Sequence, residues 1–329
     1  MPYTMRPARR GLLRGLLAAG TGLALPTIAR AQADWPSRPI RIVVPFGPGN
    51  STDAAARILA EALSPRLGRP VLVENRGGAT TTLGAAEVAR SAPDGHTLLL
   101  APPPFVITQF AFPRLPYDPE AMRPVGLVAT APVLLTVRAD LPARSVAELI
   151  ALAKARPGAL TFASVGVGSL PHVAGELVKL RGGIDMLHVP YGTGSLAATD
   201  LVAGRVDVFF TVELEVKPYI DAGRVRIIGI ATDQRQPQRP EIPAIAETIP
   251  GLRAAFWIGF LAPAGTPDAL VARINAEVNE LLNQPAIAAR LGGIALGVAP
   301  TTPAQFGEFL AGERRQWSDA VRAAQIRIE

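Results

Sequence analysis

The sequence contains no cysteine among its 329 residues. This absence excludes disulfide bonds, thiolate metal sites, a cysteine nucleophile and a lipid-bearing amino-terminal cysteine. The chain is also sparing in aromatic residues, at 5%, and in charged residues, at 18%. No basic run with interleaved aromatic side chains follows the first thirty residues. The sequence therefore predicts no binding of nucleic acid.

Residues 1–31 have the composition of an export signal, with a basic start, an apolar run and Ala29-Arg30-Ala31 as a small-x-small cleavage site. The apolar run from Leu16 to Ile28 is shorter than the roughly 20 residues that cross a bilayer. We therefore predict cleavage, a periplasmic mature chain starting near Gln32 and no stable insertion in the membrane; an uncleaved anchor is the alternative. Arg9 to Arg14 resembles a twin-arginine signal with Leu at the expected Phe, so the Sec and Tat routes both stay open.

The predicted signal carries five arginines and no acidic residue, and it accounts for most of the formal net charge of +6. The rest of the chain has 28 basic against 27 acidic residues, so its net charge indicates no polyanionic partner. An exported chain without disulfides must be stabilised by its core, and 49% of the residues are hydrophobic. The balanced charge and the lack of a dimer motif predict a monomer.

Short β-branched runs alternate with helical patterns from Pro39 onward. This βαβ alternation predicts an α/β fold with parallel-rich sheets flanked by helices. The pattern restarts once, which indicates two units of similar size. The predicted strands are Ile40 to Val44, Val71 to Glu74, Thr97 to Ala101, Val125 to Ala129, Val133 to Val137, Leu160 to Ala163, Met186 to Pro190, Val206 to Thr211 and Val225 to Ala231.

The carboxy-terminal part of the sequence is almost purely helical after a predicted strand at Phe256 to Ala262. Such helices need an apolar sheet face to cover, and the first unit offers one. We therefore predict a discontinuous first domain of residues 34–132 plus 258–329, with a second domain of residues 133–257 inserted in it. The two crossing segments would act as a hinge.

Four predicted strand-to-helix loops join glycines to hydroxyl residues, at residues 46–53, 75–85, 164–172 and 191–198. Ligands of open α/β sheets bind at the carboxyl ends of strands. Backbone N–H groups, hydroxyls and a helix dipole can hold an anion there without a cationic side chain. The alternative is that these loops only turn the chain, with Ser51, Thr52 or Asp53 as a helix cap.

Signatures of enzymes and of metal sites are missing. The first loop lacks the lysine of a phosphate-binding P-loop, and the segment around Ser169 lacks the second glycine of a nucleophile elbow. The three histidines are far apart in sequence, so we predict no metal and no cofactor. His96 and His188 are interpreted as structural. His172 could either donate to an anion or cap its turn, and Glu213 is interpreted as solvated.

The ordered blocks "VPFGPGNSTD", "VENR", "APDG", "LPYDP" and "HVPY" resemble those of the exported substrate-binding receptors of tripartite tricarboxylate transporters, often called Bug receptors. The resemblance covers nearly the whole mature chain. It implies a two-domain periplasmic binding protein fold of type II, with a ligand crevice between the domains. It also implies a receptor, not an enzyme, that closes on one small carboxylate and delivers it to separate membrane subunits.

The resemblance also implies roles for single residues. Phe46 and Tyr191 would pack on the ligand, and Gly49 and Gly168 would expose backbone amides. The hydroxyl residues would donate or accept hydrogen bonds. The candidate ligand-binding residues are Phe46, Gly49, Asn50, Ser51, Thr52, Asp53, Thr80, Thr81, Ser164, Gly168, Ser169, His172, Tyr191 and Thr193.

The chain departs from the family pattern at several of these positions. Asn50, Thr80 and Thr81 stand where the family has glycines, and Gly192 stands where a lysine is common. Ligand contact by the three new side chains is a hypothesis. The lost lysine favours a mono- or dicarboxylate, or an aromatic or amidic relative, over a citrate-like tricarboxylate.

Two other functions fit parts of the sequence. An exported α/β hydrolase could use Ser169 or Ser51 with His172, provided that an acid orients the histidine. A sensor could bind the same ligand and present it to a two-component signalling partner. The sequence alone does not name the ligand.

Overall fold

The structure is a computed structural model that describes Met1 and residues 35–328. The predicted export signal at residues 1–31 lies outside the described residues, Met1 excepted. The helices and strands of the described residues lie in one compact unit, Pro36–Glu329. No helix of the described residues has both the length and the apolar character needed to cross a membrane.

The first sheet has six strands in the order β11-β4-β10-β3-β1-β2. β1 pairs in parallel with β2 and β3, whereas β10 runs antiparallel to β3 and β4, and β11 runs antiparallel to β4. Its strands are β1 (Ile40–Val44), β2 (Val71–Asn75), β3 (Thr97–Ala101), β4 (Met122–Pro132), β10 (Ala255–Pro263) and β11 (Gly297–Val298).

The second sheet has five strands in the order β7-β6-β8-β5-β9. β6 pairs in parallel with β7 and β8, and β5 runs antiparallel to β8 and β9. Its strands are β5 (Leu134–Arg138), β6 (Thr161–Ser164), β7 (Leu187–Pro190), β8 (Val208–Thr211) and β9 (Val225–Ile230). The α/β class is thus confirmed, and both sheets are mixed, with parallel pairing confined to β1 to β3 and β6 to β8.

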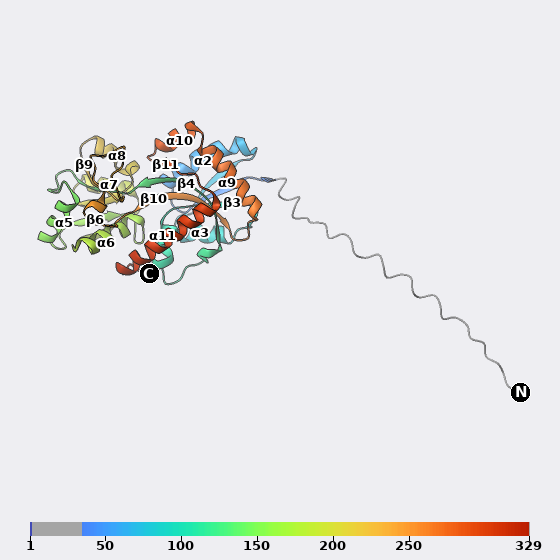
Figure 1. Cartoon of the computed structure of the whole chain (residues 1–329), viewed down its shortest axis with the longest axis horizontal. Helices are drawn as coiled ribbons and strands as arrows, with labels where there is room; N and C mark the ends of the chain where they lie inside the picture. The colour runs from blue at the N-terminus through green and yellow to red at the C-terminus, as the bar shows by residue number, and fades with distance from the viewer. Residues whose placement is uncertain (2–34, 329) are drawn as a thin grey trace. The chain divides into compact units, whose positions relative to one another are not determined.

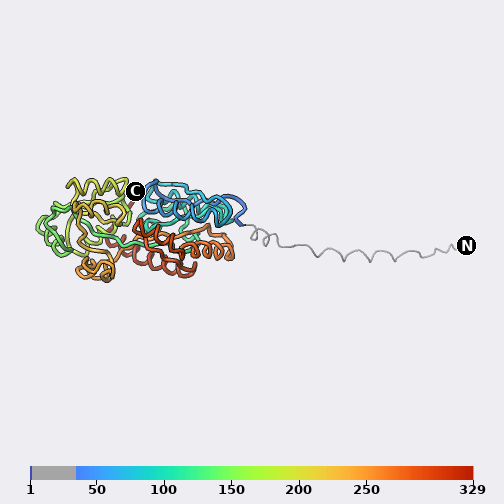
Figure 2. The backbone as a smooth tube through the Cα atoms, turned by 90° about the horizontal axis from the view of Figure 1, so that it is seen from above, coloured from blue at the N-terminus to red at the C-terminus, as the bar shows by residue number. Residues whose placement is uncertain are grey.

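Helices surround both sheets, and Figures 1 and 2 show the elements of the five-stranded sheet gathered apart from those of the six-stranded sheet. The late helices α9 and α11 pack on β4, and α11 also packs on α4 and touches α6. The helices are α2 (Ser51–Leu67), α3 (Thr82–Ala89), α4 (Pro104–Ala111), α5 (Val146–Ala155), α6 (Leu170–Gly182), α7 (Gly194–Val202), α8 (Glu213–Asp221), α9 (Asp268–Leu282), α10 (Pro285–Gly292) and α11 (Pro303–Ala323).

The core lies on the central strands and under the helices that cover them. Leu99 and Leu100 of β3 are both fully buried, as expected for a strand covered on both faces. Trp257 of β10 and Trp317 of α11 are also fully buried, and both indole N–H groups donate to one carboxylate oxygen of Glu313, at 2.7 and 2.8 Å. The carboxy-terminal helix is therefore fixed to the six-stranded sheet.

The sequence analysis did not predict helix α4, which begins at Pro104 within a run of three prolines. Proline is tolerated in the first helical turn, because the N–H groups there have no partner within the helix. β4 is also longer than predicted, since antiparallel pairing with β10 extends from Met122 to Pro132. Propensity did not reveal this long-range pairing.

Candidate ligand-binding site

The loop between β1 and α2 is organised by its own side chains. Asn50 caps α2, and its Oδ1 accepts hydrogen bonds from the backbone N–H groups of Thr52 and Asp53, at 2.9 and 3.1 Å. Its Nδ2 donates to the carbonyl oxygen of Gly47 at 2.7 Å. The backbone N–H groups of Thr52 and Asp53, which we expected to be available to an anion, therefore already donate to a side chain of the protein.

Asp53 supports the same loop. One carboxylate oxygen accepts from the backbone N–H of Gly49 at 2.9 Å, and the other accepts from Asn75 Nδ2 at 3.0 Å. Burial raises the pKa of this carboxyl, but hydrogen bonds from Arg57, Gly49 and Asn75 outweigh it, and the pKa is lowered overall. The Asp53 side chain thus holds the loop in place with oxygens that are already hydrogen-bonded.

Asn75 connects two of the candidate loops, and the sequence analysis did not single it out. Its Nδ2 also donates to the carbonyl oxygen of Phe46 at 3.1 Å, so one amide joins the loops after β1 and β2. Phe46 itself is half-buried beside this junction. The position of Asn75 in the "VENR" block, directly at the end of a parallel strand, was the signal that could have identified it.

Three hydroxyl groups at the starts of α2 and α3 are buried and have no hydrogen-bond partner among the described residues: those of Ser51, Thr52 and Thr81. The three residues are 4%, 1% and 1% exposed. Buried polar groups are nearly always hydrogen-bonded, and an unsatisfied one destabilises a protein by roughly 1–3 kcal/mol. Such unsatisfied hydroxyls can donate to a bound anion.

The loop between β2 and α3 is strained. Ala79, Thr80 and Thr81 have φ angles of 43°, 47° and 81°, in the left-handed region that favours glycine. Such conformations persist where the surroundings enforce them, and they concentrate at ligand sites. Thr80 Oγ1 donates to the carbonyl oxygen of Val167 at 3.1 Å. This bond joins the loop after β2 in the first sheet to the loop after β6 in the second.

The loop after β6 brings Ser164, Gly168, Ser169 and His172 together. His172 Nδ1 accepts the backbone N–H of Gly168 at 3.1 Å, so the ring holds the glycine in place and its remaining proton is on Nε2. Ser169 Oγ donates to the carbonyl oxygen of Gly166 at 2.6 Å. The sequence analysis left open whether His172 donates to an anion or caps its turn, and the contact with Gly168 corresponds to capping of the turn.

His188 completes this cluster. Its Nε2 lies 2.6 Å from Ser164 Oγ, and its ring stacks on that of His172 with the centroids 4.1 Å apart. Burial, and then the charges of His188 and Lys179, lower the pKa of His172 to about 3. Burial and Lys179 lower the pKa of His188 to about 4. Both rings are therefore neutral at pH 7.

Gly168 is enclosed where these loops meet. Its φ is +76°, and a Cβ on it would lie 2.3 Å from the Cδ1 of Ile328 and 3.8 Å from the Cγ2 of Thr80. The positive φ favours glycine at this position, and any larger residue would also displace the end of the Ile328 side chain.

The loop after β7 uses its polar groups internally. The Tyr191 hydroxyl donates to Asp200 Oδ2 at 2.9 Å, and burial raises the pKa of Tyr191 to about 12, with Asp200 adding to the shift. Thr193 caps α7, and its Oγ1 accepts from the backbone N–H of Leu196 at 3.4 Å. Contact of Tyr191 and Thr193 with a ligand stays a prediction.

Two glutamates at the start of α8 differ in their surroundings. The interpretation of Glu213 as solvated is wrong, because this residue is half-buried and its Oε1 lies 2.5 Å from Arg239 Nη2 in an ion pair. Glu215 has no cationic partner within 4.0 Å among the described residues, and Thr211 Oγ1 donates to it at 2.5 Å. Burial raises the pKa of Glu215. The sequence analysis weighed Glu213 and overlooked Glu215, because nothing in the pattern separates a paired glutamate from an unpaired one.

The described residues offer neither a metal site nor a serine–histidine pair at Ser51 or Ser169. Within residues 35–328 no three side chains of His, Asp or Glu come together as ligands for a metal ion. His96 accepts from the backbone N–H of Ser37 at 3.2 Å, in keeping with a structural role. Neither Ser51 nor Ser169 is hydrogen-bonded to His172 in the part of the chain that the structure describes.

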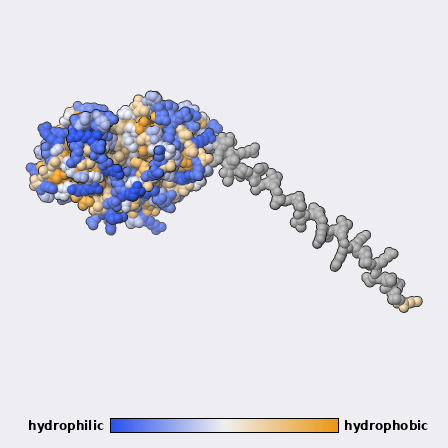
Figure 3. Space-filling view, viewed as in Figure 1, coloured by the Kyte–Doolittle hydropathy of each residue, from blue (hydrophilic) through white to orange (hydrophobic). Residues whose placement is uncertain are grey.

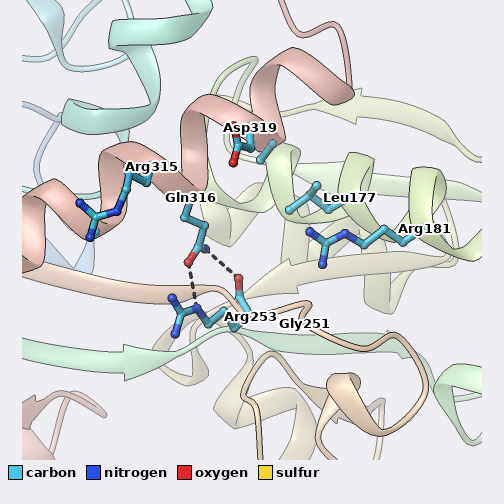
Figure 4. Close-up of a pocket in the computed structure, with 9 residues that line it drawn as sticks. Leu177, Arg181, Gly251, Arg253, Arg315, Gln316 and Asp319 are labelled. Atoms are coloured by element: carbon cyan, nitrogen blue, oxygen red, sulfur yellow. Dashed lines mark hydrogen bonds between the residues drawn. The ribbon is translucent and has the colours of Figure 1, made fainter.

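A cavity of about 290 Å³ lies elsewhere, between α6, α11 and residues 251–253 (Figure 4). Arg181, Arg253 and Arg315 line it together with Asp319. Gln316 also lines the cavity. Its Oε1 accepts from Arg253 Nε at 3.1 Å, and its Nε2 donates to the carbonyl oxygen of Arg253 at 3.0 Å. None of the predicted ligand-binding residues contributes to this cavity.

Figure 3 shows mostly hydrophilic side chains over the face in view, with small hydrophobic patches between them.

Known proteins share both the sequence and the fold of this chain. It is 39% identical over 314 residues to the "UPF0065 protein in tcbD-tcbE intergenic region" of Pseudomonas sp., covering 94% of each chain. It is 35% identical to "Protein BugT" of Bordetella pertussis, covering 96% of this chain and 97% of that one.

Solved structures agree with this. A protein of R. palustris solved with adipate has a TM-score of 0.83 and 32% identity, covering 89% of this chain and 99% of that chain. MatC from Rhodopseudomonas palustris, solved with bound malate, has a TM-score of 0.79 and 32% identity, covering 87% and 100%. Residues 55–326 match the family described as "Tripartite tricarboxylate transporter family receptor". The chain therefore belongs to the receptor family of tripartite tricarboxylate transporters, as its sequence blocks predicted.

Proposed function

We propose that this receptor captures a small organic acid in the periplasm and delivers it to the membrane subunits of a tripartite tricarboxylate-type transporter. The ligand would be a mono- or dicarboxylate, or an aromatic or amidic relative. The single observation that carries the proposal is the group of three buried, unpartnered hydroxyls of Ser51, Thr52 and Thr81. Adipate and malate in the two similar proteins support an acid as ligand.

Neutral donors can match the charge of a carboxylate. Several hydrogen bonds to a buried carboxylate stabilise its charged form, and helix N-termini add a favourable dipole. α2 and α3 both begin at this group of hydroxyls. Because none of the predicted ligand-binding residues is a lysine or an arginine, a ligand with three negative charges is less suited to this site than one with a single charge or two.

Ligand capture would use closure of two domains about a hinge. We assign residues 34–132 plus 258–329 to one domain and residues 133–257 to the other. β4 and β10, which belong to the six-stranded sheet, run next to the start of β5 in the five-stranded sheet. The bond between Thr80 and Val167 would then stabilise the closed form, in which the loops of the two sheets meet.

No catalytic step is assigned to the chain. A serine hydrolase would need a serine hydrogen-bonded to a histidine that an acid orients. Ser164 and His188 make the first of these contacts, but among the described residues no carboxylate is within 4.0 Å of His188. The receptor would therefore release its ligand unchanged.

Calorimetric titration of the mature chain tests the proposal. The protein is refolded to remove carried-over ligand and titrated with mono-, di- and tricarboxylates, aromatic acids and their amides, and each ligand is then analysed for conversion. We expect at least one ligand to bind near micromolar Kd, about −8 kcal/mol, and to be recovered intact. Conversion of a ligand would indicate a hydrolase, and the absence of binding across all acids would contradict the proposal.

Location and delivery need a second experiment. Expression of the full chain, fractionation of the cells and amino-terminal sequencing should give a periplasmic protein that starts near Gln32. Deletion of the gene should abolish uptake of the bound acid. Normal uptake with a lost transcriptional response would favour a sensor of a two-component system.

A further inference from the structure

The segment that follows α11, residues 324–328, leaves the helix in a fixed direction. Gln325 has a φ of 53°, in the left-handed region at which many helices end. The backbone N–H groups of Gln325 and Ile326 donate to the carbonyl oxygens of Arg322 and Val321, at 3.2 and 3.1 Å. These two bonds form a Schellman motif. Val321 and Ile326 are both buried in the main hydrophobic core, so the segment is anchored where it leaves the helix.

Ile328 is held by its backbone and packed by its side chain. Its N–H donates to the carbonyl oxygen of Ala111, the last residue of α4, at 2.9 Å. Its half-buried side chain packs against the main hydrophobic core. A Cβ on Gly168 would lie 2.3 Å from the Cδ1 of Ile328 and 3.8 Å from the Cγ2 of Thr80, so the methyl group of Ile328 rests against the Cα of Gly168. Three segments that are far apart in sequence therefore meet here.

This meeting point joins elements of the two sheets. α11, which precedes Ile328, packs on α4 and on β4 of the six-stranded sheet, whereas Gly168 lies in the loop after β6 of the five-stranded sheet. Thr80 Oγ1, in the loop after β2, donates to the carbonyl oxygen of Val167, the neighbour of Gly168, at 3.1 Å. One apolar contact and one hydrogen bond thus hold the same loop. Thr81, whose hydroxyl is buried and unpartnered, directly follows Thr80.

We propose that Ile328 is a positioning residue that holds the loops after β2 and β6 together in the closed receptor. The inference rests on the proposed receptor function, with its closure of two domains, and it adds a residue outside the four loops predicted to bind the ligand. If the domains separate, the Cδ1 of Ile328 leaves Gly168 and is exposed to water. Burial of apolar surface is favourable, so the contact stabilises the closed form. Because the ligand leaves from the open form, Ile328 lengthens the time for which the ligand stays bound.

Closure can be measured without a ligand, because the chain has no cysteine of its own and two introduced cysteines can be labelled specifically. Leu72→Cys in β2 and Leu187→Cys in β7 place one cysteine in an edge strand of each sheet. Both leucines are exposed, at 47% and 61%. Spin labels on these cysteines give the separation of the two sheets by pulsed electron paramagnetic resonance, without added acid and with adipate or malate.

Two substitutions at Ile328 are compared in this labelled protein. Ile328→Val removes the Cδ1 methyl group and keeps the rest of the side chain, and Ile328→Ala removes most of it. We expect a wild-type population with a short separation. Its ratio to the population with a long separation should fall about twofold to fourfold in Ile328→Val and about tenfold in Ile328→Ala, since a fully buried methylene contributes a factor of about four.

Ile150→Ala is the matched control. Ile150 is also a half-buried isoleucine packed on the main core, and its Cγ1 would lie 3.4 Å from a Cβ on Gly182. This contact joins α5 to α6, both within residues 133–257, so it does not change when the domains move. Its loss should lower the melting temperature and leave the ratio of the two separations unchanged.

Equal ratios in the wild type, Ile328→Val and Ile328→Ala would overturn the inference, and so would an equal change in Ile150→Ala. A wild type with only the long separation, with and without acid, would overturn it as well. The receptor function is judged separately by the calorimetric titration. Acids that bind there while the separations do not respond to Ile328 would leave the receptor function intact, and the absence of binding across all acids would contradict the receptor function whatever the separations show.

Discussion

The loops that follow the parallel strands of the two sheets use their polar groups in opposite ways. After β1 and β2, the hydroxyls of Ser51, Thr52 and Thr81 are buried without a partner. After β6 and β7, Ser169 and Tyr191 donate to groups of their own segment, at 2.6 and 2.9 Å. On the proposed function, the first set of loops would supply the donors to the ligand. In the second set these polar groups are already hydrogen-bonded within the chain.

The largest expected effect comes from removing the unpartnered hydroxyls. Ser51→Ala and Thr81→Val should each weaken binding of the acid by about tenfold to a hundredfold, since a hydrogen bond to a charged group contributes about 1.5–3 kcal/mol. The free energy of unfolding should stay the same or rise, because a buried hydroxyl without a partner is removed. Calorimetry and urea denaturation measure the two quantities.

Thr136→Val provides the matched control. Thr136 is equally buried, but its hydroxyl donates to the carbonyl oxygen of Phe209 at 2.7 Å. Its loss should lower stability by about 1 kcal/mol and leave affinity unchanged. If Ser51→Ala behaved like this control, the contrast between the two sets of loops would not hold.

The next largest effect should come from Asp53, whose carboxylate holds the loop between β1 and α2 in place. In Asp53→Asn an amide nitrogen replaces one of two oxygens that accept from Gly49 and Asn75, so one donor faces another donor. We expect a loss of about 2 kcal/mol of stability and weaker ligand binding. Asp140→Asn, at an exposed pair with Arg138, should change stability by less than about 1 kcal/mol. Equal effects of the two substitutions would contradict a special role for Asp53.

The second set of loops should respond to pH through His172. Its pKa is lowered to about 3 in the folded protein, so the unfolded chain binds more protons below its ordinary value near 6.5. Stability is therefore complete above pH 6.5 and falls as the pH drops from there toward 3. The slope is about 1.4 kcal/mol per pH unit for this residue.

Melting temperatures of wild type and His172→Gln between pH 7.5 and pH 4.5 measure this effect. The variant should be less stable at pH 7.5, because the bond to the Gly168 amide is disturbed, and its stability should depend less on pH. Parallel curves for the two proteins would show that His172 titrates normally in the folded state.

Much of the first set of loops was predictable from the sequence. Glycines and hydroxyls after apolar runs indicated loops at the carboxyl ends of strands, and β1 and β3 have the predicted bounds Ile40–Val44 and Thr97–Ala101. In the structure the hydroxyls of the predicted Ser51, Thr52 and Thr81 are buried and unsatisfied. Local patterns suffice for such features, because parallel strands align their loops at one edge of a sheet.

Other features depended on contacts between distant residues. The pairing of β10 with β4 made the sheets mixed, and the role of Asn75 follows from two loops that meet only in the fold. Asn50 fits the expected loop, but its amide oxygen is used as a helix cap. A single sequence does not reveal whether a polar side chain will find a partner within the chain.

The smallest effect comes from the strained loop after β2. Thr80 has a φ of 47° and donates to Val167 in the other set of loops. Thr80→Gly removes the steric penalty of the left-handed conformation, roughly 1–2 kcal/mol, while it also removes that bond and frees the unfolded chain, which offsets about 1 kcal/mol. Net stability should therefore change by less than about 1 kcal/mol.

Affinity should respond differently from stability in this variant. Because the bond of Thr80 joins loops of both sheets, its loss should weaken the closed form and lower ligand affinity by less than tenfold. Thr82→Ala is a control within the same loop, since the Thr82 hydroxyl donates to the carbonyl oxygen of Ala79 at 2.9 Å, within the loop itself. If Thr80→Gly left the affinity unchanged while Thr82→Ala lowered it, the β2 loop would act through its own shape. The contact between the two sets of loops would then contribute nothing to binding.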